Sequence, residues 1–217
     1  MRKVRVGIWG FGAMGIGMAN MILKKEGIEI VSVCSRSTSG KSMYDVLGIE
    51  RGERPEVIIN KNYEEVFREK SVDVVLLATD SFTKKAFDKI IFLLNRKINV
   101  ISTAEQMAYP QADDADLAKK MDEVAKENGV SILGTGINPG FVLDLLVLAL
   151  SGTCEEVTSI KAKRVNDLSP FGKSVMEEQG VGVTREEFIK GVEDKTIAGH
   201  VGFVESINMI ADGLGWK

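Results

Sequence analysis

The chain has 217 residues, 44% of them hydrophobic and 27% charged, and its net charge is −3. This length accommodates one full domain and part or all of a second. The sequence has no basic block that would follow a phosphate backbone, and no apolar stretch near the roughly 20 residues that cross a bilayer. We therefore predict neither a nucleic-acid partner nor a membrane partner.

Cysteine and histidine are scarce, which affects what can be predicted about the cellular compartment and about metal binding. Cys34 and Cys154 lack metal-like spacing, and His200 is the only histidine. Two lone thiols are typical of a reduced protein, and the first apolar run begins too close to Met1 to leave room for a signal peptide. We predict a cytoplasmic protein without a metal site.

Strand-like and helix-like segments alternate through the first two thirds of the chain. Apolar runs at Val4–Trp9 and Glu29–Ser35 predict strands, with a helix over Ala13–Lys25 between them. The further predicted strands are Val57–Ile59, Val72–Ala78, Asn99–Ser102 and Val130–Leu133, and the further helices are Thr83–Asn95, Ala112–Asn128 and Phe141–Leu150. Such an alternation is typical of a doubly wound parallel sheet, so residues 1–150 are predicted to form an α/β Rossmann domain.

The pattern changes in the last third of the chain. Glu156–Asn166 alternates polar and apolar residues and predicts one long strand of a second sheet. Thr184–Glu187 has the form of a capping box before a helix, and Gly199–Leu214 predicts a last amphipathic helix. One strand and two helices do not close a sheet-bearing domain. We interpret residues 151–217 as an incomplete α+β substrate-binding and dimerisation domain, completed by another chain or by residues beyond this sequence.

A glycine-rich turn joins the first predicted strand to the first predicted helix. Its residues are Gly10, Phe11, Gly12, Ala13, Met14 and Gly15. In a dinucleotide-binding turn the first glycine permits the tight bend, the second lets the backbone approach the pyrophosphate, and the third lets helix and strand pack closely. The free N–H groups and the positive end of the helix then face the anion. The strand–turn–helix context predicts a nicotinamide dinucleotide site here.

The end of the second predicted strand bears on the choice of cofactor. An acidic residue about 20 positions past the last glycine would bind the ribose 2′-hydroxyl of NAD. That neighbourhood contains Ser35, Arg36 and Ser37, with Lys41 nearby and no carboxylate before Asp45. A guanidinium and two hydroxyls would hold a 2′-phosphate, which favours NADP, with NAD as the alternative. The competing interpretation is that Arg36 is a solvated loop residue.

Two more segments follow strands at the carboxyl edge of the predicted sheet. Ala78 and Thr79 are predicted to contact the ribose or nicotinamide, and Asp80 is interpreted as the cap of the next helix. Thr103, which is predicted to contact the cofactor, and Glu105 follow the next strand. A glutamate beside the nicotinamide and under apolar residues would have a raised pKa and could carry protons near neutral pH. The alternative is a surface-loop carboxylate.

A second glycine-rich segment, Gly134–Gly140, follows the last strand of the predicted sheet. Its three glycines and Pro139 specify an irregular, tightly turned backbone that suits close approach to a flat ligand, and the alternative is a plain turn. Asn138 is predicted to contact the cofactor. His200 begins the last predicted helix. From the residues alone, it is equally well a substrate-pocket residue or an ordinary helix-start residue.

Five sequence blocks resemble the family of 2,4-diaminopentanoate dehydrogenase and the related native amine dehydrogenases. The blocks are Gly134–Phe141, Ala162–Asn166, Leu168–Gly172, Met176–Gly180 and Ala198–Phe203. The amino-terminal half is also similar to dihydrodipicolinate reductase. The resemblance implies NAD(P)-dependent oxidative deamination of the C4 amine of 2,4-diaminopentanoate to 2-amino-4-oxopentanoate, in ornithine breakdown, by a homodimer.

The resemblance also implies roles for particular residues. Glu105 matches the glutamate that handles proton transfers in native amine dehydrogenases. The substrate-binding residues that the resemblance implies are Pro139, Phe141, Arg164, Asn166, Phe171 and His200. Because family chains extend well beyond the equivalent of Trp216, we interpret this sequence as a partial one. Two alternatives stay open. One is a dihydrodipicolinate reductase, although that family uses a neighbouring pair of histidines and this sequence has a single histidine. The other is a non-catalytic NADP-binding protein.

Overall fold

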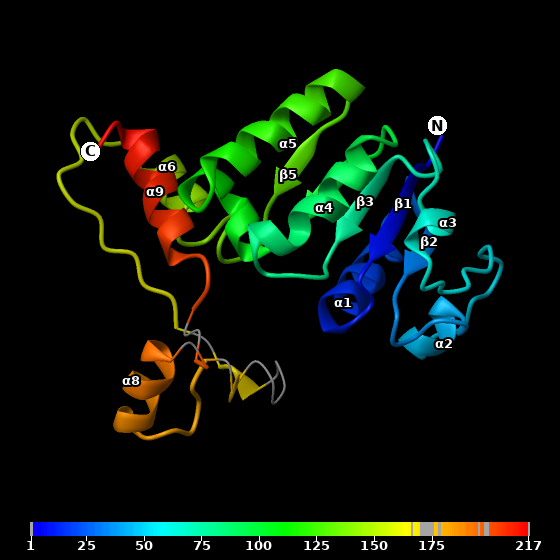
Figure 1. Ribbon diagram of the computed structural model, residues 1–217, viewed down its shortest axis with the longest axis horizontal. Coiled ribbons are helices and arrows are strands. Elements are labelled where there is room, and N and C mark those ends of the chain that lie inside the picture. Colours follow the sequence, from blue (N-terminus) through cyan, green and yellow to red (C-terminus); the bar gives the residue numbers. More distant parts are fainter. Residues whose placement is uncertain are drawn as a thin grey trace. The chain divides into compact units, whose positions relative to one another are not determined.

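The computed structural model describes residues 2–165, 167–169, 176–177, 179–194, 196–197 and 200–216. The chain divides into two compact units, Met1–Gly136 and Ile137–Lys217. The first unit contains the sheet, and the regular elements of the described second unit are helices (Figure 1). Our domain assignment, with its boundary after residue 150, stays a prediction.

The first unit is built on a five-stranded sheet in the order β2-β1-β3-β4-β5, with every neighbouring pair parallel. The strands are β1 (Val4–Trp9), β2 (Ile28–Cys34), β3 (Val74–Leu77), β4 (Asn99–Ser102) and β5 (Ile132–Gly134). The strand order reverses at β1, between β2 and β3, and in such sheets a crevice for ligands opens there at the carboxyl ends of the strands. The predicted doubly wound α/β fold is confirmed.

Helices cover both faces of this sheet. They are α1 (Ala13–Ile22), α2 (Met43–Leu47), α3 (Tyr63–Val66), α4 (Thr83–Leu94) and α5 (Ala115–Asn128), with two 3₁₀ helices, η1 (Glu105–Ala108) and η2 (Pro110–Ala112). Successive strand residues point to opposite faces. Val75 and Leu77 therefore enter the core beneath α4 and α5, while Val74 and Leu76 pack in the core shared with α1 and α2.

Helix caps follow the local sequence. The Asn62 side chain accepts a hydrogen bond from the Glu64 N–H at 3.1 Å and caps α3. The Asp114 side chain accepts from the Leu117 N–H at 3.1 Å and begins α5, later than predicted because η2 precedes it. Gly129, in the left-handed region at φ 65°, ends that helix.

No regular strand forms at Val57–Ile59, where one was predicted. The next residue, Asn60, makes a single parallel bridge to Cys34 at the end of β2. Through it, the Ser35 N–H donates to the Asn60 carbonyl at 3.0 Å and the Asn60 N–H donates to the Val33 carbonyl at 3.1 Å. The segment thus lies along the last residues of β2, at the outer edge of the sheet.

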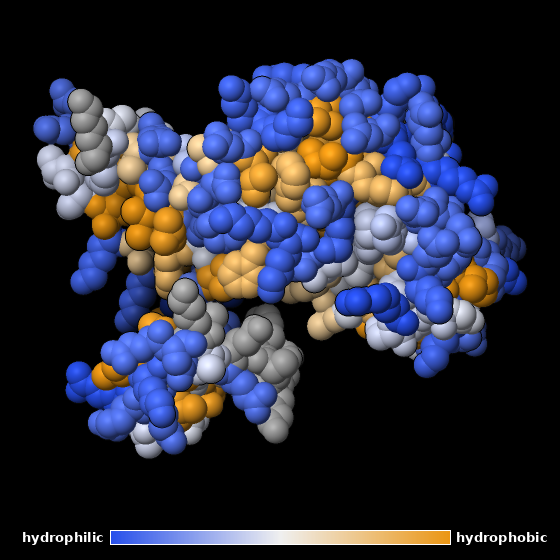
Figure 2. Space-filling view, in the orientation of Figure 1, coloured by the Kyte–Doolittle hydropathy of each residue, from blue (hydrophilic) through white to orange (hydrophobic). Residues whose placement is uncertain are grey.

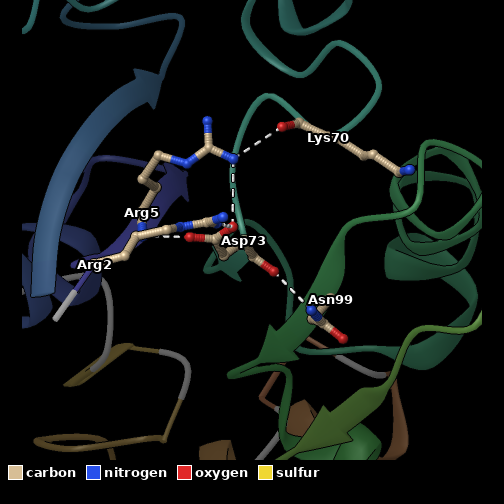
Figure 3. Close-up of polar contacts among 5 residues, drawn as sticks. All are labelled: Arg2, Arg5, Lys70, Asp73 and Asn99. Atoms are coloured by element: carbon tan, nitrogen blue, oxygen red, sulfur yellow. Dashed lines mark hydrogen bonds and ion pairs between the residues drawn. The ribbon is translucent and has the colours of Figure 1, made fainter.

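Figure 3 shows a polar cluster near the amino-terminal ends of β1, β3 and β4. The Asp73 carboxylate accepts hydrogen bonds from the Arg5 backbone N–H at 2.8 Å and from the guanidinium groups of Arg5 and Arg2. Arg5 also donates to the Lys70 carbonyl at 3.0 Å, and the Asn99 side chain donates to the Asp73 carbonyl at 2.7 Å. The pKa of Asp73 is lowered from 3.8 to about 2. The main cause is the backbone hydrogen bond from Arg5, and the next is the hydrogen bond from the Arg2 guanidinium.

We expect Asp73→Asn to destabilise the first unit by about 1 kcal/mol at neutral pH, allowing for solvent screening of a partly exposed carboxylate. Because the folded-state pKa is depressed, this stabilisation is complete above the unfolded pKa of 3.8 and is lost as the pH falls toward about 2. Urea unfolding of wild type and variant at both ends of this pH range measures the difference. Asp122→Asn, which removes an exposed partner of Lys126, is the control. A difference that persists unchanged below the folded pKa would contradict the assignment.

The described second unit contains α6 (Leu145–Ser151), α8 (Arg185–Glu193) and α9 (Phe203–Leu214). The predicted capping box is confirmed: the Thr184 hydroxyl accepts from the Glu187 N–H at 3.3 Å, and the Glu187 carboxylate accepts from the Thr184 N–H at 2.8 Å. α6 packs on α9, where a Cβ on Gly213 would lie 2.7 Å from the Leu148 side chain.

One prediction for the second unit was wrong, and another was confirmed over only part of its range. Residues 156–165 of the predicted strand Glu156–Asn166 form neither strand nor helix, and Asn166 lies outside the described residues. Alternation alone does not make a strand, because its backbone groups need a neighbouring strand as partner. The predicted helix over Phe141–Leu150 begins only at Leu145, because the Asp144 side chain accepts from the Leu145 N–H at 2.6 Å and caps it there.

Apolar side chains stay exposed on α6 and α9. Figure 2 shows hydrophobic residues gathered in the region of α9. The exposed members are Leu145 and Leu150 on α6, and Phe203, Val204 and Ile207 on α9.

Candidate functional site

The three glycines of the first turn differ in what surrounds them. Gly10 has φ +99°, and a Cβ there would lie 2.3 Å from the Ala78 carbonyl oxygen. A Cβ on Gly15 would lie 2.0 Å from the Gly10 carbonyl oxygen. A Cβ on Gly12, by contrast, would meet no described atom within 4 Å. Gly10 and Gly15 therefore permit the fold of the turn, whereas Gly12 leaves its backbone open to a ligand.

A cavity of about 720 Å³ opens beside this turn, at the carboxyl ends of β1, β2 and β3. It brings together eight of the predicted cofactor residues: Gly10, Phe11, Gly12, Ser35, Arg36, Ser37, Ala78 and Thr79. Ser35 is buried, and its hydroxyl lies 3.4 Å from that of Ser37. Positions far apart in sequence, from Gly10 to Thr79, thus line one cavity.

The other predicted cofactor residues do not line this cavity. Ala13, Met14 and Gly15 lie in the first turn of α1, where an α-helix leaves its N–H groups without intrahelical partners. Their backbone N–H groups, not their side chains, are what they can offer an anion. Lys41 lies elsewhere, and its carbonyl accepts from the Ile59 N–H at 2.9 Å.

Asp80 does not cap α4, contrary to prediction. Its carboxylate accepts from the Lys89 ammonium at 2.7 Å and from the Thr79 hydroxyl at 2.6 Å, within the cavity lining. The N–H of Thr83 at the start of α4 donates instead to the Gln106 side chain at 3.0 Å. Sequence reasoning could not find this cap because its two partners are 23 residues apart.

Glu105 begins η1, just beyond the end of β4. Ser102, the last residue of β4, pairs with Leu77 of β3, and the Thr103 N–H donates to the Leu77 carbonyl at 3.0 Å. The chain therefore leaves β4 at the same edge of the sheet from which it leaves β3. Glu105 is half-buried there. It lies at the same edge of the sheet as the cavity but is not one of the residues that line the cavity.

Two further contacts fix η1 in place. The Gln106 backbone N–H donates to the Ser81 carbonyl at 3.2 Å, which adds to its side-chain bond with Thr83. On the other side, a Cβ on Gly134 would lie only 1.7 Å from the Met107 carbonyl oxygen. The first glycine of the segment Gly134–Gly140 therefore lets η1 pack directly on β5, a role that the sequence did not indicate.

The site residues of the first unit form a row along the carboxyl edge of the sheet. Arg36 follows β2, Gly10 follows β1, Thr79 follows β3 and Glu105 follows β4, in the spatial order of the strands. Three strand spacings span about 14 Å. The row therefore offers anion-binding groups at one end and a carboxylate at the other.

The second unit brings together three other predicted residues. The Asn138 amide nitrogen lies 2.9 Å from His200 Nε2, and a Cβ on Gly202 would lie 2.4 Å from Pro139. Asn138 Oδ1 and His200 Nδ1 are buried and have no hydrogen-bond partner among the described residues. Asn138 and His200, predicted separately and 62 positions apart, thus form one polar pair.

Asp144 is a residue that the sequence analysis did not single out, because it lies within the predicted helix Phe141–Leu150. It is fully buried and accepts from the Gly140 N–H at 2.7 Å and the Ser206 hydroxyl at 2.9 Å, besides capping α6. It ties the glycine-rich segment to α6 and α9. Phe141 is half-exposed, Arg164 lies in the segment without regular structure, and Asn166 and Phe171 lie outside the described residues.

The two cysteines are expected to differ sharply in reactivity. Cys34 lines the cavity but is only 2% exposed, and burial raises its pKa to about 11, whereas Cys154 is exposed. Since the thiolate is the reacting species, a disulfide reagent at neutral pH should titrate one thiol rapidly and the second only after unfolding. The Cys154→Ser variant should lose the rapid phase. Rapid labelling of that variant would contradict the burial of Cys34.

Over the residues that the structure describes, no helix is both long enough and apolar enough to span a membrane. Over the same residues, no three His, Cys, Asp or Glu side chains cluster as a metal site would require. The prediction that the protein has no metal stays a prediction.

Comparison with known proteins agrees with this architecture. A curated relative, 2,4-diaminopentanoate dehydrogenase from Acetoanaerobium sticklandii, is 62% identical over 218 residues, which cover 100% of this chain and 62% of the relative. The amine dehydrogenase from Mycobacterium smegmatis has a TM-score of 0.83 at 24% identity, over 98% of this chain and 62% of that one. The WlbA dehydrogenase from Bordetella pertussis, solved with NADH and UDP-GlcNAcA, has a TM-score of 0.52 at 17% identity, over 70% and 40% of the two chains.

The chain thus spans 62% of the length of the curated relative and of the amine dehydrogenase, and the two structural likenesses show the fold alone. The resemblance to 2,4-diaminopentanoate dehydrogenase is confirmed, and residues 141–217 match the family described as the 2,4-diaminopentanoate dehydrogenase C-terminal domain. Residues 5–132 match the family described as the semialdehyde dehydrogenase NAD-binding domain, which accounts for a nicotinamide cofactor. The chain therefore belongs to the family described as the semialdehyde dehydrogenase NAD-binding domain, whose model matches more than half of it.

Proposed function

We propose that this protein oxidatively deaminates the C4 amine of 2,4-diaminopentanoate with NADP. The observation that carries the proposal is the 62% identity, over the whole of this chain, with a 2,4-diaminopentanoate dehydrogenase. In the balanced reaction the amine, water and NADP⁺ give 2-amino-4-oxopentanoate, ammonium, NADPH and a proton. Water supplies the carbonyl oxygen, and the hydrogen on C4 leaves with two electrons as hydride.

The turn and the cavity fit such a cofactor. Gly12 presents open backbone where a Cβ would block approach, and the first turn of α1 offers N–H groups to a diphosphate. Arg36 and the hydroxyls of Ser35 and Ser37 line the cavity at the end of β2, which favours NADP over NAD. When bound, the nicotinamide supplies the hydride acceptor.

We assign the proton transfers to Glu105. Its carboxylate takes a proton from the substrate ammonium, which leaves a neutral amine able to lose hydride from C4. It releases this proton to solvent, which is the proton among the products, and as a carboxylate again it takes a proton from the attacking water and returns that one to the departing ammonia. Its place supports this role, because it follows β4 in the row that begins with Arg36 at β2.

The second unit is proposed to supply the substrate contacts. Asn138, Pro139 and Phe141 would wall the substrate, and Arg164 or His200 would hold its polar end. The pairing of Asn138 with His200 supports a shared role, since the pair retains buried polar atoms without partners among the described residues. The homodimer and the cytoplasmic location stay predictions.

Mixing the purified protein with NADP and 2,4-diaminopentanoate tests this function. We expect NADPH to form only with the diamine present, with one ammonia released for each NADPH. The monoamine 2-aminopentanoate, which lacks the C4 amine, is the control. Cofactor binding without NADPH formation from any diamine would instead support a non-catalytic NADP-binding protein.

A further inference from the structure

The segment Asn60–Tyr63 reaches the cofactor cavity although no dinucleotide motif includes it. The parallel bridge between Asn60 and Cys34 holds it against the end of β2, and the Lys61 carbonyl lies 3.9 Å from the Cys34 thiol. Because the segment runs parallel to β2, the residues after Asn60 emerge at the same carboxyl edge as Arg36. Lys61 and Tyr63 accordingly line the cavity with Arg36.

The cavity's charges are divided between two sides. On the side of β3 and α4 the charges are mixed: the lining residues are Asp80, Lys85, Asp88 and Lys89, and Asp80 neutralises Lys89 at 2.7 Å. On the side of β2, Arg36 and Lys61 line the cavity together with Ser35 and Ser37. Across the described part of the chain, neither Arg36 nor Lys61 forms an ion pair. The β2 side therefore presents two cations and two hydroxyls, which suits a dianionic phosphate.

An aromatic surface adjoins these cations. The Tyr63 ring stacks on Trp9 with centroids 4.9 Å apart and an interplanar angle of 22°, and Phe92 meets it edge-on at 4.9 Å. Trp9 is 7% exposed, whereas Tyr63 remains 40% exposed. One face of the Tyr63 ring is thus supported from behind while the residue stays accessible. Such a fixed aromatic ring is a platform on which a nucleobase stacks.

We propose that Lys61 and Tyr63 complete the site for the adenosine 2′-phosphate end of NADP. Lys61 joins Arg36 in holding the 2′-phosphate, and Tyr63, supported by Trp9, carries the adenine ring. This inference rests on the NADP preference in the proposed function and adds the residues that determine it. It also accounts for a cavity that extends past the glycine turn to the segment Asn60–Tyr63.

Calorimetric titration with two nucleotides that lack nicotinamide tests the proposal. Adenosine 2′,5′-bisphosphate and adenosine 5′-monophosphate differ only in the 2′-phosphate. We expect the wild-type protein to prefer the bisphosphate, and Lys61→Gln to reduce that preference about tenfold, the effect of one charge-assisted contact. Lys119→Gln, an exposed lysine on α5, is the matched control and should leave the preference unchanged.

Variants of Tyr63 test the adenine platform separately. Tyr63→Ala should weaken both nucleotides by about tenfold, while Tyr63→Phe, which keeps the ring, should bind both as the wild type does. An unchanged preference in Lys61→Gln, or unchanged affinity in Tyr63→Ala, would overturn the proposal. Neither nucleotide can be reduced, so these results are independent of turnover: normal nucleotide recognition without deamination would refute the proposed function alone.

Discussion

Glu105→Gln is expected to lower the turnover of 2,4-diaminopentanoate by at least about a hundredfold, the usual loss when a general acid–base is removed. Glutamine keeps the size of the side chain but cannot take the ammonium proton or activate water. NADP affinity should stay unchanged, because Glu105 lies at the β4 end of the row and outside the lining of the cavity.

Steady-state rates and NADP titration, measured on the same preparation, separate these two effects. Glu123→Gln, on the exposed surface of α5, is the control for loss of a carboxylate and should retain both activities. Turnover within a few-fold of the wild type would remove Glu105 from the mechanism. Joint loss of turnover and NADP binding would show instead that the substitution disturbs η1.

Gly12→Ala is expected to abolish tight NADP binding while the protein still folds. The backbone at Gly12, with φ −91° and ψ −158°, suits any residue, and a Cβ there meets no described atom within 4 Å. The methyl group would instead occupy the space through which the diphosphate approaches the turn. We expect a loss of at least about a hundredfold in affinity, as for a blocked set of charge-assisted hydrogen bonds.

Gly17→Ala provides a matched control for this prediction. Gly17 lies on the same helix, α1, and a Cβ there also meets no described atom within 4 Å, but Gly17 is not part of the cavity lining. The variant should bind NADP normally and gain slightly in stability, because alanine favours a helix by about 1 kcal/mol over glycine. Normal NADP affinity in Gly12→Ala would show that the diphosphate does not rest on this turn.

The parts of the fold that depend on local pattern could be predicted from the sequence. Strand Asn99–Ser102 has the predicted bounds, and α4 ends one residue before the predicted Asn95, because an apolar run between polar segments defines each element by itself. The glycine turn was recognisable for the same reason. Its strand, bend and helix are contiguous, so spacing alone specifies them.

The parts that depend on distant partners could not be predicted. Alternation over Glu156–Asn166 indicates a strand, but whether one forms depends on a neighbouring strand that no local pattern reports. Lys61 and Tyr63 reach the cavity only because Asn60 bridges to Cys34, a residue 26 positions earlier in the chain. Lys61 follows the predicted strand Val57–Ile59, so a search for charged residues after each predicted strand would have indicated it. That it lies beside the end of β2 could not be predicted, because this depends on the bridge between Asn60 and Cys34.

Our central claim is that NADP extends along the carboxyl edge of the sheet, from Arg36 after β2 to Glu105 after β4. A crystal structure of the protein with NADP tests it most directly. We predict the diphosphate on the backbone N–H groups of the turn Gly10–Gly15, the 2′-phosphate beside Arg36, and the nicotinamide at the end of β4, within reach of Glu105. A diphosphate bound away from that turn, or a nicotinamide directed away from Glu105, would contradict the account.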